Sequence, residues 1–146
     1  MQIALWLFVG LIGGAAYLYY GRQQGVESEN KVFALGLLIA AIIYVGFGLM
    51  WGDAAWVGIE MAGVLLYGLF AFLGFRKHAL WLAFGWLMHV GWDIGLHLFG
   101  PGVHIVPEWY AYACISFDAI MAGYIAYQFW VSRSEFRVVR EQHSLY

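Results

Sequence analysis

Long apolar stretches alternate with short polar segments along the whole chain. A bilayer core of about 30 Å needs roughly 20 residues of apolar helix. Five stretches come close to or exceed that length, at residues 2–20, 32–51, 54–75, 79–99 and 108–131. The pattern therefore predicts an all-α integral membrane protein, in which residues 1–131 form one bundle of five transmembrane helices.

The predicted connections differ in length and polarity. Residues 21–31 are expected to form a polar loop, and Gly52-Asp53 a tight turn. Residues 100–107 contain two glycines and two prolines, which is typical of a real break between helices. The polar segment 132–146 is predicted to be a cytoplasmic tail. It would either continue the fifth helix or form a short helix at anionic lipid headgroups.

Composition supports a membrane protein. The chain has 146 residues, of which 64% are hydrophobic and only 11% charged, whereas a soluble domain typically carries about 25% charged residues. The net charge of -2 argues against nucleic acid as a partner. Cys114 is the single cysteine, which excludes a disulfide within the chain.

The basic residues predict an orientation. With five crossings, all seven Lys and Arg fall on one side of the membrane: Arg22, Lys31, Arg76, Lys77, Arg133, Arg137 and Arg140. Lys and Arg in short loops mark the cytoplasmic side. We therefore expect a multi-pass protein of the inner (plasma) membrane, with the N-terminus outside and the C-terminus in the cytoplasm.

A few ionisable residues interrupt three of the predicted helices, all in the half that would face outward. They are Glu60, His89, Asp93, His97 and Asp118. The helical rise of about 1.5 Å per residue places Asp118 about 15 Å from the outer end of its helix and His97 only about 3 Å from the end of its own. Ionisable groups inside a membrane are costly and often functional. Matched depths on three helices predict one shared polar site.

Helix geometry divides this set. Residues four apart lie on one face of an α-helix, so His89, Asp93 and His97 form a single stripe that also contains Trp86. We expect His89 and Asp93 to belong to the deep site, and His97 to lie near its mouth. Taken singly, a histidine here can be an ordinary interhelical hydrogen-bonding group. Tyr44 on the second helix is expected to be a core residue.

Two histidines and three carboxylates suggest a divalent transition metal, zinc or iron, because mixed nitrogen and oxygen ligands suit these ions. The candidate ligands are His89, Asp93, His97, Glu60 and Asp118. One set of four omits His97, and a shallower set combines Asp93, His97 and Glu60. A metal-activated water could hydrolyse a lipid ester or amide.

An acid–base enzyme needs no metal. Asp118, Asp93 and Glu60 are then the catalytic carboxylates, and proton transfer could isomerise or cyclise a lipophilic small molecule such as a terpenoid. Trp86 and Trp92 would bind this substrate through their aromatic faces. Alternatives are a proton or cation transporter and an accessory subunit that binds metal or lipid. The inner halves of the helices lack ionisable residues, which disfavours transport.

Two cofactors fit poorly. A retinal Schiff base requires a buried lysine, whereas Lys31 and Lys77 lie at helix ends. Haem is disfavoured because His89 and His97 share one helix, so binding an iron from both sides would need a second protomer or a ligand other than histidine. Gly91 and Gly95 have the spacing of a close helix–helix contact and could support a homodimer. Membrane lipids are the other expected partners.

One block of sequence resembles a known family. It reads Gly85-Trp-Leu-Met-His89-x-x-Trp92-Asp93-x-x-x-His97-x-x-Gly100, then Pro107, then Cys114-x-x-x-Asp118. The pattern is similar to that of a small bacterial family of multi-pass membrane proteins of unknown function, and the resemblance covers residues 85–122. It implies a site made of His89, Asp93, His97 and Asp118, but it implies no activity. Phe117 stands where the family has a second cysteine, which puts a thiol-based role in doubt.

Overall fold

The protein folds into a bundle of helices, seen here in a computed structural model that describes the backbone of residues 2–143 and the side chains of residues 2–25 and 28–131. Five α-helices and one π-helical segment follow in order: α1 (Gln2–Gln23), α2 (Val26–Trp51), α3 (Ala54–Arg76), α4 (Ala79–Trp92), the π-helix η1 (Asp93–Leu98) and α5 (Glu108–His143). The predicted all-α bundle of five helices is confirmed.

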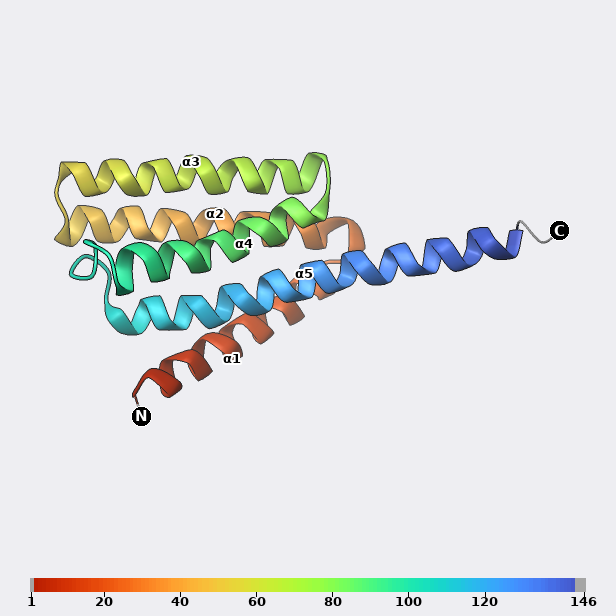
Figure 1. Cartoon of the computed structure of the whole chain (residues 1–146), viewed down its shortest axis with the longest axis horizontal. Helices are drawn as coiled ribbons and strands as arrows, with labels where there is room; N and C mark the ends of the chain where they lie inside the picture. Colours follow the sequence, from red (N-terminus) through yellow and green to blue (C-terminus); the bar gives the residue numbers. More distant parts are fainter. Residues whose placement is uncertain (1, 144–146) are drawn as a thin grey trace.

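Short connections force consecutive helices to run in opposite directions. Figure 1 shows α2, α3 and α4 side by side, with α5 lying along α4 and α1 crossing beneath α5. Helix α1 diverges from α2 toward its N-terminal end. The first described residues therefore lie at one end of the bundle, together with the α2–α3 turn and the loop before α5, and α5 ends at the opposite side.

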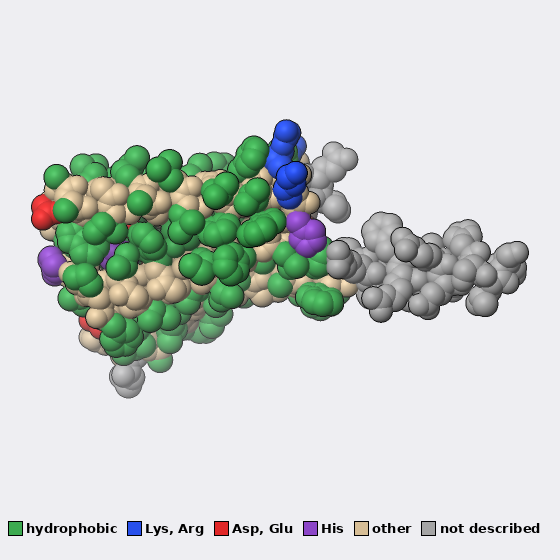
Figure 2. All heavy atoms as spheres, turned by 45° about the horizontal axis from the view of Figure 1, so that its top comes forward, with side chains coloured by type: hydrophobic (Ala, Val, Ile, Leu, Met, Phe, Trp, Pro, Cys, Tyr) green, Lys and Arg blue, Asp and Glu red, His purple; other side chains and the backbone are tan. Residues whose placement is uncertain are grey.

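Four helical segments of the described chain are long and apolar enough to cross a membrane. They are Gln2–Gln23, Ser28–Trp51, Ala54–Arg76 and Ala79–Leu98. Large apolar side chains cover the outside of the bundle, as Figure 2 shows, and several are more than two-thirds exposed, including Leu49, Leu65 and Phe99. This exterior is typical of a protein surrounded by lipid. The crossing by α5 and the orientation remain predictions.

The first connection is shorter than the sequence predicted. The expected polar loop at residues 21–31 is wrong: α1 continues to Gln23 and α2 begins at Val26. Hydropathy marks where a helix leaves the hydrocarbon, whereas Glu, Lys and Gln are good helix formers that extend helices beyond it. Gly25 makes the turn with φ of 82°, a left-handed conformation that glycine adopts without strain.

Apart from the end of α5, the other helix ends agree with the prediction within a few residues. Asp53 caps α3 by accepting a hydrogen bond of 3.0 Å from the backbone nitrogen of Trp56. The backbone of α5 continues to His143, so the helical continuation of the fifth helix is observed in the tail. Its last residues, 144–146, lie outside the described part of the chain, and so do the tail's side chains.

The loop before α5 folds back over the end of the bundle. The backbone nitrogen of Gly102 donates to the oxygen of Leu96 at 2.9 Å, and Ile105 and Val106 are buried against Tyr44. A side chain at position 102 would approach the Trp56 ring to 2.7 Å, so this close approach requires glycine. The loop thereby covers the polar residues inside the bundle with apolar side chains.

The glycines expected to mediate a dimer face outward. Gly91 and Gly95 are exposed, and a Cβ atom at either position would meet nothing within 4 Å in the described chain. A homodimer through this face remains a prediction.

Candidate functional site

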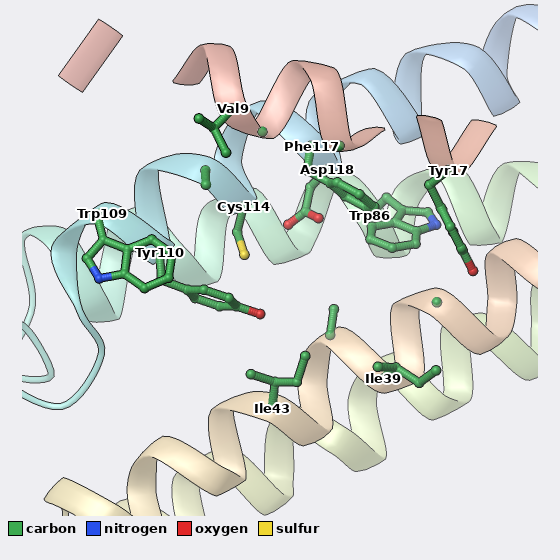
Figure 3. Close-up of a pocket in the computed structure, with 15 residues that line it drawn as sticks. Val9, Tyr17, Ile39, Ile43, Trp86, Trp109, Tyr110, Cys114, Phe117 and Asp118 are labelled. Atoms are coloured by element: carbon green, nitrogen blue, oxygen red, sulfur yellow. The ribbon is translucent and has the colours of Figure 1, made fainter. Parts of the chain in front are cut away.

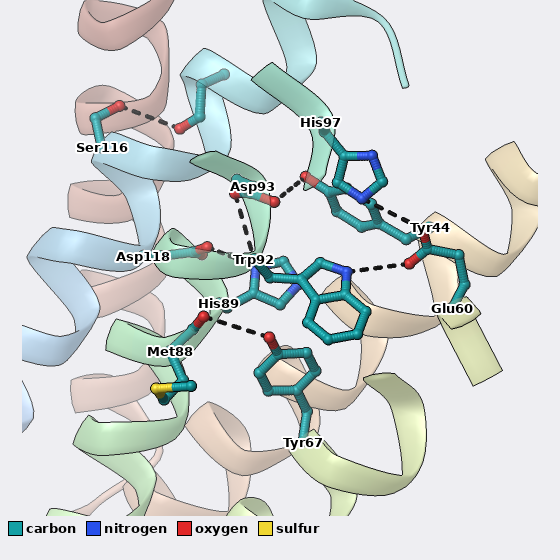
Figure 4. Close-up of polar contacts among 11 residues, drawn as sticks. Tyr44, Glu60, Tyr67, Met88, His89, Trp92, Asp93, His97, Ser116 and Asp118 are labelled. Carbon is teal, nitrogen blue, oxygen red and sulfur yellow. Dashed lines mark hydrogen bonds and ion pairs between the residues drawn. The ribbon is translucent and has the colours of Figure 1, made fainter. Parts of the chain in front are cut away.

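Three ionisable side chains, from α4, from the π-helix η1 that continues it and from α5, meet inside the bundle. His89 on α4 lies with its Nδ1 2.7 Å from Asp118 Oδ2 on α5 and 3.8 Å from Asp93 Oδ2 one turn further along its own chain. All three side chains are at most 1% exposed. Figure 4 shows the imidazole between the two carboxylates. The depth argument from the sequence had placed His89 and Asp118 at similar levels of their helices, and the structure brings the two side chains into contact.

Tyr44 forms a hydrogen bond with Asp93, one of the two carboxylates of this cluster. Its hydroxyl donates a hydrogen bond of 2.5 Å to Asp93 Oδ1, and its ring packs edge-on against His89 with the ring centroids 5.2 Å apart. Tyr44 is 1% exposed. The expectation that it is a core residue was therefore incomplete, because its hydroxyl is part of the site. The available signal was a hydroxyl in the outer half of an otherwise apolar helix.

A π-helical turn positions His97. Residues Asp93–Leu98 form η1, in which the backbone nitrogen of Phe99 donates to the oxygen of Ile94 five residues earlier. Such a turn holds more residues than an α turn. His97 is consequently rotated relative to the α-helical stripe assumed from the sequence. It is 0% exposed and lies inside the bundle, so its expected place at a wet mouth is wrong.

His97 forms a second buried pair, with Glu60 on α3. Its Nε2 lies 3.2 Å from Glu60 Oε1, and Glu60 Oε2 accepts a hydrogen bond of 3.2 Å from Trp92 Nε1. Glu60 is therefore part of a neighbouring pair and is absent from the close group of His89, Asp93 and Asp118. The Tyr44 ring lies between the two groups, with its centroid 4.9 Å from that of His97.

Several polar atoms in these two groups have no hydrogen-bond partner within the described part of the chain. They are Glu60 Oε1, His89 Nε2, Asp93 Oδ2 and both ring nitrogens of His97; Glu60 Oε1 and His97 Nε2 approach to 3.2 Å without the geometry of a hydrogen bond. Trp86 Nε1, which belongs to neither group, also has no partner there. A buried polar atom without a partner costs about 1–3 kcal/mol. Such atoms gathered in one region are more typical of a functional site than of structural helix packing.

An apolar groove leads to this cluster from the side of the bundle. It has a volume of about 390 Å³ and lies between α1, α2 and α5. Figure 3 shows Asp118 and Cys114 of α5 pointing into it, opposite Ile39 and Ile43 of α2. The groove also contacts Trp86 of α4. Asp118 is thus shared between the polar cluster and the groove lining.

The two tryptophans expected to bind a substrate lie in different places. Trp86 is completely buried at the base of the groove and contacts Phe117, with ring centroids 5.7 Å apart. Trp92 is absent from the groove lining. It packs edge-on against Tyr67 on α3, at a centroid distance of 5.9 Å, in addition to bonding Glu60.

A metal ion could be held by the first cluster. His89, Asp93 and Asp118 each offer one ligand atom, and these three atoms lie within 4.8 Å of one another. Among the described residues this is the group that brings together three of the five expected ligands. Glu60 and His97 would supply a separate pair of ligand atoms.

Comparison with known proteins places the chain in a family. A family model described as a family of unknown function, DUF6010, matches residues 9–132. The chain belongs to the DUF6010 family. The matched region contains both buried groups and every residue of the groove lining. Comparisons with curated proteins and with solved structures gave no match. The function of this DUF6010 protein must therefore be argued from its site.

Proposed function

We propose that this protein is a membrane-embedded enzyme that acts on a lipophilic substrate at His89, Asp93 and Asp118. One observation carries the proposal: Asp118 contacts His89 inside the bundle and also lines the apolar groove. A substrate in the groove would therefore meet a carboxylate paired with an imidazole. Pockets of a few hundred Å³ with apolar walls and few polar groups are typical ligand sites.

The cluster supports a metal-dependent mechanism. Catalytic zinc sites commonly use three protein ligands and leave a position for water or substrate. The imidazole and two carboxylates within 4.8 Å of one another match that donor set, for zinc or for iron. Zinc–ligand distances are about 2 Å, so His89 Nδ1 and Asp118 Oδ2, now 2.7 Å apart, would separate slightly on binding. An ion there would polarise a carbonyl group and favour hydrolysis of a lipid ester or amide.

The same residues support acid–base catalysis without a metal. The contact of 2.7 Å between His89 Nδ1 and Asp118 Oδ2 is a direct path for a proton. Asp118 would exchange a proton with the substrate, and His89 would exchange it with Asp118. The Trp86 face in the groove would stabilise positive charge on a terpenoid during isomerisation or cyclisation.

Lipid turnover tests the enzyme proposal. The full chain is reconstituted in vesicles made from lipids of its native membrane, and the lipid composition is followed by mass spectrometry. We expect at least one lipid species to be converted by the wild type, and Asp118→Asn to slow this conversion by about 100-fold or more. His104→Ala is the matched control, because His104 is an exposed loop residue. Equal turnover in Asp118→Asn, or none in the wild type, contradicts the proposal.

Metal content separates the two mechanisms. Elemental analysis of the purified protein is expected to give one zinc or iron ion per chain in the wild type and in His104→Ala. His89→Ala and Asp118→Ala should lose it, because each removes one of three ligands. A wild type that turns over lipid and holds no metal supports the acid–base mechanism.

A further inference from the structure

The groove opens on the side of the bundle, among exposed apolar side chains. Its rim consists of exposed apolar residues, with Val9 45%, Ile39 48% and Trp109 48% exposed. Its base consists of buried residues, with Trp86 0% and Asp118 1% exposed. The rim follows α1, α2 and α5, and α1 diverges from α2 on this side (Figure 1). A ligand therefore enters sideways from the bilayer.

The groove lining carries no positive charge. None of the fifteen lining residues is Lys or Arg, and Asp118 is the only carboxylic acid among them. An anionic phosphate or carboxylate group would lie beside Asp118 with no countercharge. Burying a charge without a partner in apolar surroundings is strongly unfavourable. The lining thus selects an uncharged ligand.

Trp86 adds a hydrogen-bond donor to this apolar lining. Its Nε1 is buried and has no hydrogen-bond partner in the described chain, although a buried indole N–H usually finds one. Figure 3 shows the Trp86 ring between Asp118 and Tyr17 along the groove. The Tyr17 hydroxyl already donates to Val32 O at 2.6 Å. The indole N–H therefore lacks an acceptor in the described chain, and a ligand oxygen brought into the groove beside Trp86 would supply one.

The position of Asp118 also restricts the ligand. It follows the first residue of α5, Glu108, by ten positions, which corresponds to about 15 Å along the helix. A hydrocarbon core of about 30 Å places this level near the middle of the membrane. Phospholipid headgroups lie at the interface, far from this level. The group recognised here must therefore be one that can leave the interface and enter the hydrocarbon region, as an uncharged oxygen function can.

We infer that the groove binds an uncharged, long-chain lipid through an oxygen acceptor, such as an ester or ketone carbonyl, that accepts a hydrogen bond from the Trp86 N–H at the Tyr17 end of the indole ring. This inference names the substrate class of the proposed enzyme and rests on that proposed function. It excludes phosphorylated lipids and ionised fatty acids as ligands of the groove.

Photolabelling with two matched probes tests the inference. One probe is a stearic acid methyl ester with a diazirine at mid-chain, and the other is the corresponding free acid at alkaline pH. Each is added to vesicles that contain the full chain, and labelled residues are identified by peptide mass spectrometry. We expect the ester to label the stretch from Trp109 to Asp118 and the free acid to label it at least about tenfold less, because its charge opposes burial.

Two variants in the groove and one control variant outside it test where the probe binds. Gly13→Leu should reduce ester labelling about tenfold or more: a Cβ there meets only the Phe117 ring, at 3.5 Å, so the longer side chain extends into the groove. Gly58→Leu, on an exposed part of α3 with nothing within 4 Å of the added Cβ, should leave labelling unchanged. Trp86→Phe keeps an aromatic ring and removes the donor, so a reduction of about two- to tenfold is expected.

Competition provides a test without any variant. Excess unlabelled methyl stearate should suppress labelling of the wild type, and stearate at alkaline pH should not. Equal labelling by both probes, or equal labelling of Gly13→Leu and Gly58→Leu, overturns the inference. Groove labelling without lipid turnover would contradict the proposed enzyme and leave this inference standing. Turnover without groove labelling would overturn only the inference.

Discussion

The hydroxyl of Tyr44 donates a hydrogen bond of 2.5 Å to Asp93 Oδ1, across 49 positions of the sequence. This contact ties α2 to the start of the π-helical turn. The other oxygen of Asp93 has no hydrogen-bond partner among the described residues and lies 3.8 Å from His89 Nδ1. Tyr44 thereby fixes one carboxylate oxygen and leaves the other directed at the imidazole.

Tyr44→Phe tests this contact. The ring packing against His89 is retained, whereas Asp93 loses the donor that satisfies it. A hydrogen bond to a carboxylate is worth about 1.5–3 kcal/mol, so we expect the free energy of unfolding in detergent to fall by about that amount. Tyr127→Phe is the control, because Tyr127 is 64% exposed. Equal stability of the two variants contradicts the assigned role of Tyr44.

The Glu60–His97 pair should show strong coupling. Glu60→Ala removes the acceptor of the Trp92 N–H and the carboxylate oxygen 3.2 Å from His97 Nε2, and leaving a buried polar group without its partner costs about 1–3 kcal/mol. Glu60→Gln keeps an acceptor for Trp92 and should cost less. A double-mutant cycle of Glu60→Gln with His97→Gln should give a coupling energy of about 0.5–3 kcal/mol. The corresponding cycle of Glu60→Gln with His104→Gln should give none, and similar values in both cycles would refute the pairing.

Sequence reasoning found the residues of the site but did not pair them correctly. The sequence predicted one buried cluster because His89 and Asp93 are four residues apart and Asp118 lies at a matching depth. Both arguments rest on the regular rise and periodicity of the α-helix. The π-helical turn breaks that regularity after Asp93, and no hydrophobic pattern reveals it. His97 was therefore placed near the surface, and its partnership with Glu60 was considered only as part of a shallower ligand set that also included Asp93.

The fold was predicted more completely than the site. Hydropathy located five helices, because a helix needs about 20 apolar residues to cross a bilayer. It misplaced the end of α1 and the start of α2, where polar residues remain helical up to Gln23 and from Val26 onward. Side-chain partners such as Tyr44 depend on how helices rotate against one another. One-dimensional patterns do not determine that rotation.

Asp53 should contribute to the start of α3. Its side chain accepts a hydrogen bond of 3.0 Å from the backbone nitrogen of Trp56. Loss of an N-cap costs about 1 kcal/mol, so Asp53→Ala should lower the free energy of unfolding by that amount, and Asp53→Asn, which keeps an acceptor, should change it little. Identical unfolding of both variants would show that the cap is not used.

Orientation is tested by labelling introduced cysteines in a Cys114→Ala background. His104→Cys and Lys77→Cys lie at opposite ends of the bundle, in exposed connections. The cluster of Lys and Arg at one end predicts that a membrane-impermeant thiol reagent added to whole cells labels position 104. Position 77 should be labelled only after the membrane is opened. The reverse result would invert the proposed orientation.

The central claim is that the buried cluster and the lateral groove form one site that meets at Asp118. Dicyclohexylcarbodiimide, an apolar reagent that modifies carboxylic acids within membranes, tests it directly when the modified residue is identified by peptide mass spectrometry. Asp118 is the only acid in the groove lining, so it should be modified first, before Asp93 and Glu60, and Gly13→Leu should slow the reaction while Gly58→Leu does not. Modification of Asp93 or Glu60 at the same rate as Asp118, or an unchanged rate in Gly13→Leu, would contradict the account.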